Sequence, residues 1–189
     1  SWVEHETTLG AFFTATLGFN DYLYLNLQGR NDWTSTLEKE NRTIFYPSAS
    51  VSFLATEAID ALNNDILNYL KLRLGYGTSA GYPFPYTTGQ YLSSGTKIWQ
   101  TPGGTDLNYN SVSNRLGNPN IKPELHEEIE AGIEAKLLNG IVGIDASVYQ
   151  KNSDDLIIDL DLDPATGYTV TNVNAASIEN KGIELGLNI

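Results

Sequence analysis

Paired carboxylates are the side chains of this sequence that could most readily do chemistry. Glu128 and Glu130 stand two residues apart in a glutamate-rich stretch, and two carboxyl groups are what glycoside hydrolysis requires. The two histidines, His5 and His126, are far apart in sequence, and cysteine is absent, so general bases and thiol nucleophiles are scarce. We therefore expect these glutamates to lie on a hydrated strand face, and we expect a chain that is not an enzyme and uses no cofactor.

A second acidic group lies in the segment "DDLIIDLDLDPATG". Alternation along a strand places Asp159, Asp161 and Asp163 on one face, an oxygen-rich arrangement that hard cations favour. An EF-hand loop starting at Asp159 would need glycine at its sixth position and glutamate at its twelfth, where Pro164 and Val170 stand. These aspartates are weak candidates for adventitious calcium, and no metal site is predicted.

Aromatic side chains gather in a long polar segment between residues 78 and 123, which prolines stiffen. Aromatic rings stack on sugar faces and on peptide side chains, so this segment is the best candidate for contact with a substrate or a protein partner. The alternative is that the rings only pack the segment onto the rim of the fold. The candidates are Tyr82, Phe84, Tyr86, Tyr91 and Trp99.

The elements that position these residues are predicted to be strands. Asn139-Gly140 between alternating apolar and polar residues is a strong hairpin signal. A two-residue turn there pairs Leu137 with Val142 and puts the apolar residues of both arms on one side of the sheet. The first arm alone could also form an amphipathic helix, but the second arm alternates and is rich in β-branched residues, so strands are favoured.

A second hairpin is predicted near the start of the sequence. A three-residue loop from Phe19 to Asp21 aligns Leu17 with Leu23, whereas a two-residue loop would turn the apolar residues of one arm to the opposite face. Three further alternating segments, 48–55, 70–76 and 182–189, bring the expected count to seven antiparallel strands. The 57–68 link between two of them has the composition of a helical turn.

Every predicted strand has one apolar face and one face of polar, charged or glycine residues. Two architectures fit: a soluble β-rich binding module with the apolar face as its core, or the wall of a large transmembrane β-barrel with that face against lipid. In the barrel, the residues facing a water-filled lumen would be Lys71, Arg73, Glu128, Glu130, Glu134, Asp145 and Glu184. Aromatic residues expected at the membrane interfaces are Tyr22, Trp33, Phe45, Tyr46 and Tyr76.

Connection lengths favour the barrel. Taking alternate strands as antiparallel, the tight turns near residues 20 and 139 fall at one end, and the 78–123 connection falls at the other, as periplasmic turns and extracellular loops do. Seven is an odd number and the last residues lack a terminal aromatic, so an incomplete wall is expected. The net charge is −12, with no basic stripe, which excludes a nucleic-acid partner.

Four sequence blocks, in order and at similar spacing, resemble the barrel of SusC/RagA-type TonB-linked outer-membrane transporters. They are "RNDW" at 30–33, "FYPS" at 45–48, "NPNIKPE" at 118–124 and "IENKGIE" at 178–184. Together they span most of the chain, from about Gly29 to Leu187, and they are specific as a set.

The resemblance implies a Gram-negative outer-membrane protein with a plugged barrel of about 22 strands in a lipid bilayer. It also implies a SusD-like surface lipoprotein as partner, a glycan or peptide substrate, and energy from the TonB complex acting through a plug. Residues 1–189 match barrel wall alone, so the plug domain, TonB box and closing strands are expected outside this sequence. The resemblance implies no catalytic residue.

Overall fold

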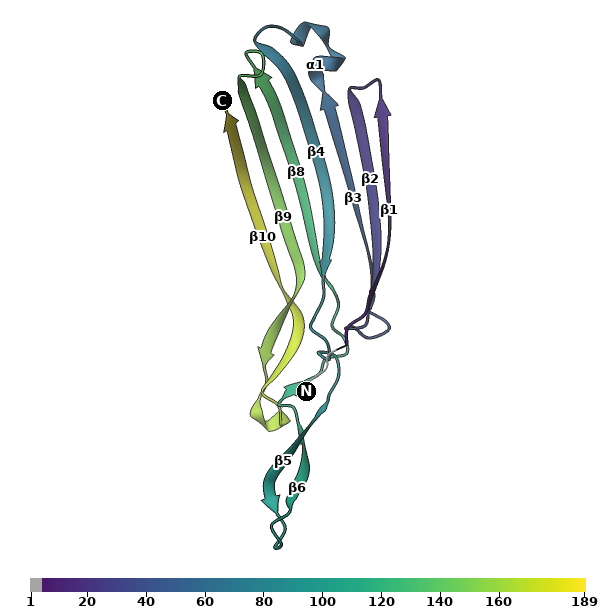
Figure 1. The fold of residues 1–189 in the computed structure, drawn as a ribbon, viewed down its shortest axis with the longest axis vertical. Coiled ribbons are helices and arrows are strands. Elements are labelled where there is room, and N and C mark those ends of the chain that lie inside the picture. The colour runs from purple at the N-terminus through teal and green to yellow at the C-terminus, as the bar shows by residue number, and fades with distance from the viewer. Residues whose placement is uncertain (1–4) are drawn as a thin grey trace.

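Seven long strands form a single curved sheet in the structure, a computed structural model that describes residues 5–189 (Figure 1). For residues 96–99 and 106–107 only the backbone is described. Neighbouring long strands are antiparallel, in the order β1-β2-β3-β4-β8-β9-β10. The long strands are β1 (Thr8–Phe19), β2 (Leu23–Thr34), β3 (Thr43–Leu54), β4 (Leu67–Gly81), β8 (Glu124–Leu137), β9 (Val142–Asp161) and β10 (Val170–Asn188).

The two ends of the sheet differ, as the connection lengths predict. One end holds the tight turns together with α1 (Ala55–Ala58) and η1 (Asp60–Leu62), so the helical turn expected within 57–68 is confirmed, although it starts earlier (Figure 1). The other end carries a hairpin of β5 (Leu92–Gln100) and β6 (Asp106–Val112), which projects beyond the sheet. We call this second end the loop end.

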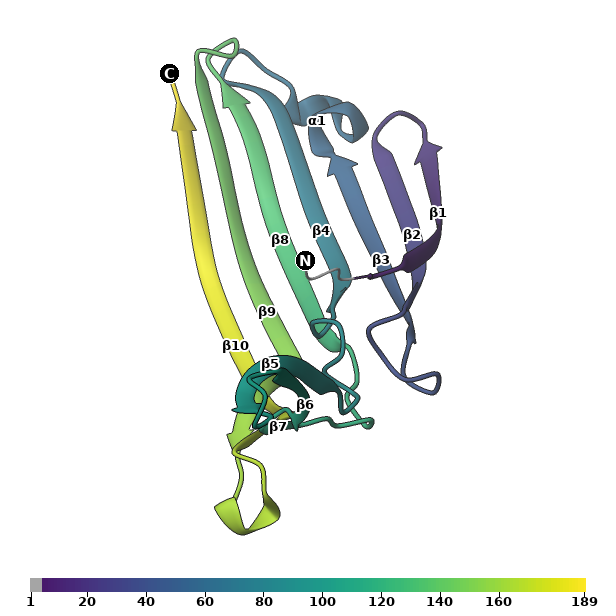
Figure 2. The same ribbon diagram turned by 60° about the horizontal axis from the view of Figure 1, so that its bottom comes forward.

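Two short elements complete the loop end. The two-residue strand β7 (Arg115–Leu116) pairs in parallel with the start of β10, and η2 (Pro164–Thr166) connects β9 to β10. Figure 2 brings this end forward and shows β10 and β1 as the two lateral edges of the sheet. Among the described residues, no helix has the length and apolar character needed to cross a membrane.

The predicted register of the second hairpin is confirmed. Leu137 pairs with Val142, and Ala131 pairs with Val148, so residues 125–137 are extended rather than helical. At the turn, Asn139 and Gly140 have φ angles of 56° and 85°, values that glycine and asparagine adopt more readily than other residues.

The first hairpin has the predicted loop length but a different register. Its loop is Asn20–Tyr22, so Phe19 pairs with Leu23 and Leu17 with Leu25. The Tyr22 ring packs edge to face against Phe19 and Phe53, with centroid distances of 5.7 and 5.9 Å. These aromatic contacts hold Tyr22 in the loop, and the two-residue shift leaves every side chain on its predicted face.

The apolar face is continuous and uncovered. One row crosses all seven strands through the paired residues Leu17, Leu25, Val51, Leu74, Ala131, Val148 and Ile183. Ile183 is 81% exposed and Leu185 is 76% exposed. The buried apolar residues of the described chain are only Leu37, Ala55 and Ile121, none of which belongs to this row. The alternative in which the apolar face forms an interior core is therefore wrong.

One interfacial aromatic was assigned to the wrong face. Tyr46 pairs with Arg30 on β2, which places it on the polar side, and its hydroxyl donates a hydrogen bond to Asp32. The hydrogen-bond partner of the Tyr46 hydroxyl is therefore the buried Asp32 carboxylate and not a lipid headgroup. Tyr76 does lie on the apolar side, with its hydroxyl donating to Glu127 Oε1 at 2.7 Å.

Candidate functional site

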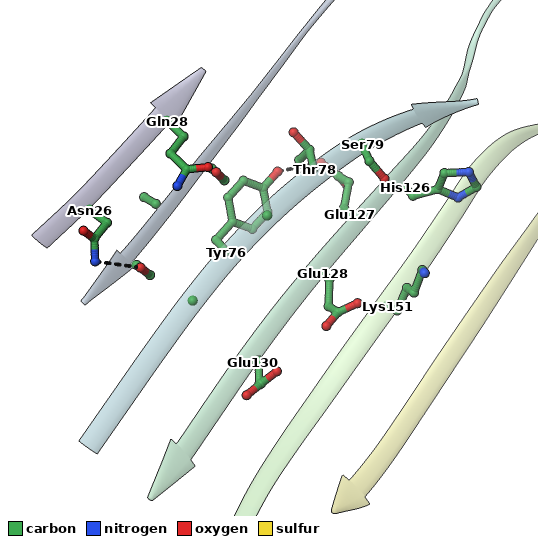
Figure 3. Close-up of a pocket in the computed structure, with 15 residues that line it drawn as sticks. Asn26, Gln28, Tyr76, Thr78, Ser79, His126, Glu127, Glu128, Glu130 and Lys151 are labelled. Atoms are coloured by element: carbon green, nitrogen blue, oxygen red, sulfur yellow. Dashed lines mark hydrogen bonds between the residues drawn. The ribbon is translucent and has the colours of Figure 1, made fainter. Parts of the chain in front are cut away.

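The polar face of the sheet forms a shallow hollow of about 440 Å³ (Figure 3). Five neighbouring strands, from β2 to β9 in sheet order, contribute side chains to it. The polar residues that line it include Asn26, Gln28, Ser48, Ser50, Ser79, His126, Glu128, Glu130 and Lys151. Amides, hydroxyls and charges of both signs therefore face the same hydrated space.

Two cations on β4 separate two carboxylates that the register brings together. Glu134 on β8 is directly opposite Asp145 on β9, a like-charge pairing that is unfavourable by itself. Lys71 lies 3.6 Å from Glu134, and Arg73 donates two hydrogen bonds of 2.8 and 2.7 Å to Asp145. Arg73 Nε also lies 3.3 Å from Glu130. The three strands β4, β8 and β9 thus share one network of alternating charge.

Gly132 gives Arg73 the space to reach Asp145. Gly132 is the residue of β8 that pairs with Arg73, and a Cβ atom there would lie 2.4 Å from Arg73 Nε. Because glycine has no side chain, the Arg73 side chain crosses β8 and reaches β9. The sequence pattern identified Gly132 only as a member of the polar face.

The remaining lumen-facing candidates share this face without joining the network. Glu128 is opposite Lys151 on β9, and Glu184 on β10 is opposite Ser147 on β9. Among the side chains that the structure describes, no salt bridge involves Glu128 or Glu184. The expectation that these side chains face a lumen depends on a closed barrel and stays a prediction.

The loop aromatics meet in one hollow of about 470 Å³ at the loop end, which we call the loop pocket. Four of the five predicted aromatics line it, and the side chain of the fifth, Trp99, lies outside the described residues. The lining comes from the segment 82–91 and from the ends of β7, β8, β9 and β10. The predicted aromatics that line it are Tyr82, Phe84, Tyr86 and Tyr91.

A closed triad of polar side chains forms one side of the loop pocket. Arg115 donates to both Asp159 oxygens at 2.8 and 2.9 Å, and to Asn172 Oδ1 at 2.6 Å. Asn172 Nδ2 in turn donates to Asp159 Oδ1 at 2.7 Å. The hydrogen bonds from Arg115 hold the pKa of Asp159 below its usual range, so the carboxylate is charged at neutral pH.

The structure does not gather the weak metal candidates into a site. Asp159 is held by Arg115, and Asp163 Oδ1 accepts a hydrogen bond of 2.8 Å from the Ala165 backbone amide at the start of η2. Within the described part of the chain, no group of three acidic, histidine or cysteine side chains is placed to hold a metal ion.

Asp32 is a functional candidate that the sequence patterns did not identify. It is only 3% exposed, and it accepts hydrogen bonds from Arg30, Tyr46 and Tyr82. Arg30 Nε donates at 2.8 Å and the Tyr82 hydroxyl donates at 3.4 Å. Burial, with the Asp32 carboxylate nearby, raises the pKa of Tyr82. Asp32 on β2 is thus hydrogen-bonded both to Tyr46 on β3 and to Tyr82, a residue that lines the loop pocket.

This two-faced antiparallel sheet, with short turns at one end and long loops at the other, defines the wall of an outer-membrane β-barrel. Residues 2–189 match the family model described as "TonB dependent receptor-like, beta-barrel". The chain therefore belongs to the TonB-dependent receptor-like β-barrel family, whose members are outer-membrane proteins of Gram-negative bacteria.

Two relatives support the assignment. The chain is 31% identical to TonB-dependent receptor P26 of Formosa agariphila, over 90% of this chain and 17% of that protein. It is 30% identical to TonB-dependent receptor SusC of Bacteroides thetaiotaomicron, over 89% of this chain and 17% of that protein. The chain thus spans less than a fifth of these relatives. Both are named as TonB-dependent receptors and not as enzymes, in agreement with the prediction of a non-enzymatic chain.

Solved structures show the same fold. The RagAB peptide importer in its closed-closed state superposes with a TM-score of 0.82 at 23% identity, over 95% of this chain and 19% of that chain. The siderophore receptor PirA from Pseudomonas aeruginosa superposes with a TM-score of 0.64 at 16% identity. The strand arrangement is therefore shared with proteins described as importing peptides and as recognising siderophores.

Proposed function

We propose that residues 1–189 supply part of the barrel wall of an outer-membrane importer of oligosaccharides or peptides. The observation that carries the proposal is that the sheet has two opposite faces. One face carries an apolar row, and the other carries a charged, hydrated hollow. The chain also belongs to the TonB-dependent receptor-like β-barrel family. A lipid-facing surface and a water-filled lumen need these two faces.

The chemical class of the cargo is proposed from the loop end and from the relatives. SusC and the RagAB peptide importer are both close to this chain in fold or sequence. The aromatic loop pocket offers ring faces of the kind that stack on sugars and peptide side chains. We therefore expect an oligomeric organic substrate that enters from the loop end, which is the extracellular end in barrels of this kind.

Two partners belong to the proposal. A SusD-like surface lipoprotein would cover the loop end and capture substrate, and the TonB complex would supply energy through a plug domain. The plug domain, the TonB box and the closing strands would come from parts of the protein outside residues 1–189. The edges β1 and β10 would then pair with further strands of the barrel, which satisfies backbone groups that lipid cannot.

Uptake by cells tests the proposal. The full-length protein and its lipoprotein partner would be expressed in a Gram-negative host, and entry of fluorescently labelled oligosaccharides and peptides would be followed with and without functional TonB. We expect uptake of one substrate class that needs both the full-length protein and TonB. Uptake that is unchanged without TonB, or a full-length protein that folds in water without detergent or lipid, would contradict it.

A further inference from the structure

The loop pocket combines exposed aromatic rings with a loop that is held in one conformation. Phe84 is 86% exposed, an unusual state for a phenylalanine, and it stands between Pro83 and Pro85. The Thr87 hydroxyl donates to the Phe84 carbonyl at 2.7 Å, and the Thr88 hydroxyl donates to Glu38 Oε1 at 2.9 Å. A loop fixed by prolines and hydrogen bonds loses little conformational entropy when a ligand binds.

Further contacts fix both ends of the 82–87 segment. The Asn118 amide donates to the Thr87 carbonyl at 3.2 Å, and the Tyr82 hydroxyl at the start of the segment is held by Asp32. Tyr86 has a φ angle of 65°, which is rare for a bulky residue and persists only where the surrounding structure imposes it. The aromatic rings of this segment are therefore held in position before a ligand binds.

The polar side of the loop pocket is electrically balanced. Arg115 and Asp159 neutralise each other through two parallel hydrogen bonds, and Asn172 bridges the pair. Arg115 uses three of its five N–H groups for these two residues, so two N–H groups have no partner within the described chain. The triad can thus donate and accept hydrogen bonds without presenting a free charge.

The nearby charge argues against an anionic ligand. Glu124 lines the loop pocket, and its Oε1 accepts a hydrogen bond of 2.8 Å from the Ile157 amide. A sulfate or carboxylate would meet the Glu124 charge and find Arg115 already paired. A neutral ring with several hydroxyl groups would meet neither obstacle.

We infer that the loop pocket is a binding subsite for a neutral sugar ring of an oligosaccharide substrate. The positively polarised C–H groups on one face of the sugar would stack on Phe84 and its neighbouring rings, whose faces carry partial negative charge. The sugar hydroxyls would bind the Arg115–Asp159–Asn172 triad. This inference rests on the proposed importer function and chooses oligosaccharides over peptides as its cargo.

Calorimetric titration of the purified full-length protein in detergent tests the inference. The probes are maltohexaose, cellohexaose, xylohexaose and mannohexaose, with a uronic-acid hexasaccharide and a neutral pentapeptide for comparison. We expect at least one neutral hexasaccharide to bind, and Phe84→Ala and Arg115→Gln each to weaken its binding by about tenfold or more. Phe84→Tyr keeps an aromatic ring and should retain the affinity.

The matched control is Val112→Ala, which shortens an exposed apolar residue of the same long loop that does not line the loop pocket. Heat-modifiable electrophoretic mobility would show that each variant barrel is folded. The inference is overturned if Phe84→Ala and Arg115→Gln leave saccharide affinity unchanged, if no neutral hexasaccharide binds, or if the peptide alone binds. These outcomes leave the importer proposal intact, because TonB-dependent uptake of either substrate class tests that proposal separately.

Discussion

Arg73 on β4 reaches across β8 to Asp145 on β9, and its guanidinium group holds both carboxylate oxygens, at 2.8 and 2.7 Å. This contact joins strands that are distant in sequence and not adjacent in the sheet. It also removes the repulsion that the pairing of Glu134 with Asp145 would otherwise create. The polar face is therefore an organised charge network and more than a hydrated surface.

The network predicts coupled effects of Arg73 and Asp145. Arg73→Gln should lower the denaturant midpoint of the full-length barrel, since Asp145 then faces Glu134 without its guanidinium partner. Asp145→Asn in the same chain should recover part of that loss, because it removes the stranded charge. Both effects should shrink in 1 M salt, which screens partly exposed pairs. Strictly additive effects of the two substitutions would show that the pair is not coupled.

Gly132 offers a second test with an internal control. Gly132→Ala places a methyl group where Arg73 lies, so Arg73 must move away from Asp145 and the denaturant midpoint should fall. Gly75→Ala, on the same face, meets only Ser50 Cβ at 3.9 Å, and should be neutral or stabilise by about 0.4–1 kcal/mol. In an Arg73→Gln background, Gly132→Ala should no longer be harmful. A loss that persists there would assign another role to Gly132.

Alternation along the strands predicted the faces correctly, and its limits have a physical cause. A side chain points to the same face after any shift of two residues, so the apolar pattern could not choose between pairing Leu17 with Leu23 and pairing it with Leu25. The contacts of the Tyr22 ring with Phe19 and Phe53 decide the register, and these contacts join three chain positions that no local pattern relates.

The candidate site was predicted only in part, because long-range contacts also determine which of its residues come together. The loop aromatics were identified by residue type alone, but their convergence with Arg115 and Asp159 depends on β7 pairing with β10. Asp32 was missed because its partners come from β2, β3 and the segment after β4. Long-range contacts of this kind leave no periodic signal in the sequence.

Asp32 should control the order of the loop end. Asp32→Ala removes the acceptor shared by Tyr46 and Tyr82, and leaving buried partners unsatisfied should destabilise the protein by about 1–3 kcal/mol. The 82–123 segment should also become more sensitive to limited proteolysis. Tyr82→Phe should have a smaller effect on stability, because Asp32 keeps its bonds from Arg30 and Tyr46. Equal proteolysis of Asp32→Ala and the parent protein would exclude this role.

Asp159 gives the loop end a defined pH dependence. Because Arg115 lowers the pKa of Asp159 in the folded protein, the ion pair stabilises the fold above the ordinary aspartate pKa of about 3.9. That stabilisation is lost as the pH falls through the lowered, folded-state pKa. The denaturant midpoint of Asp159→Asn should therefore lie below that of the parent protein at pH 7, and the difference should shrink steadily in strong acid. A difference that is the same at pH 7 and in strong acid would contradict the ion pair.

The central claim is that the apolar face contacts lipid and the polar face contacts water. Ile183 and Glu184 are neighbours on β10 that point to opposite faces, and residues 1–189 contain no cysteine. Nitroxide labels would be attached at Ile183→Cys and, separately, at Glu184→Cys in the full-length protein, with cysteines elsewhere replaced by serine.

Collision rates of each label with oxygen, which concentrates in lipid, and with a water-soluble nickel chelate would be measured in bilayers. We expect the label at 183 to collide mainly with oxygen and the label at 184 mainly with the nickel chelate. Equal exposure of both labels to the chelate, or the opposite preference, would contradict the assignment of the two faces.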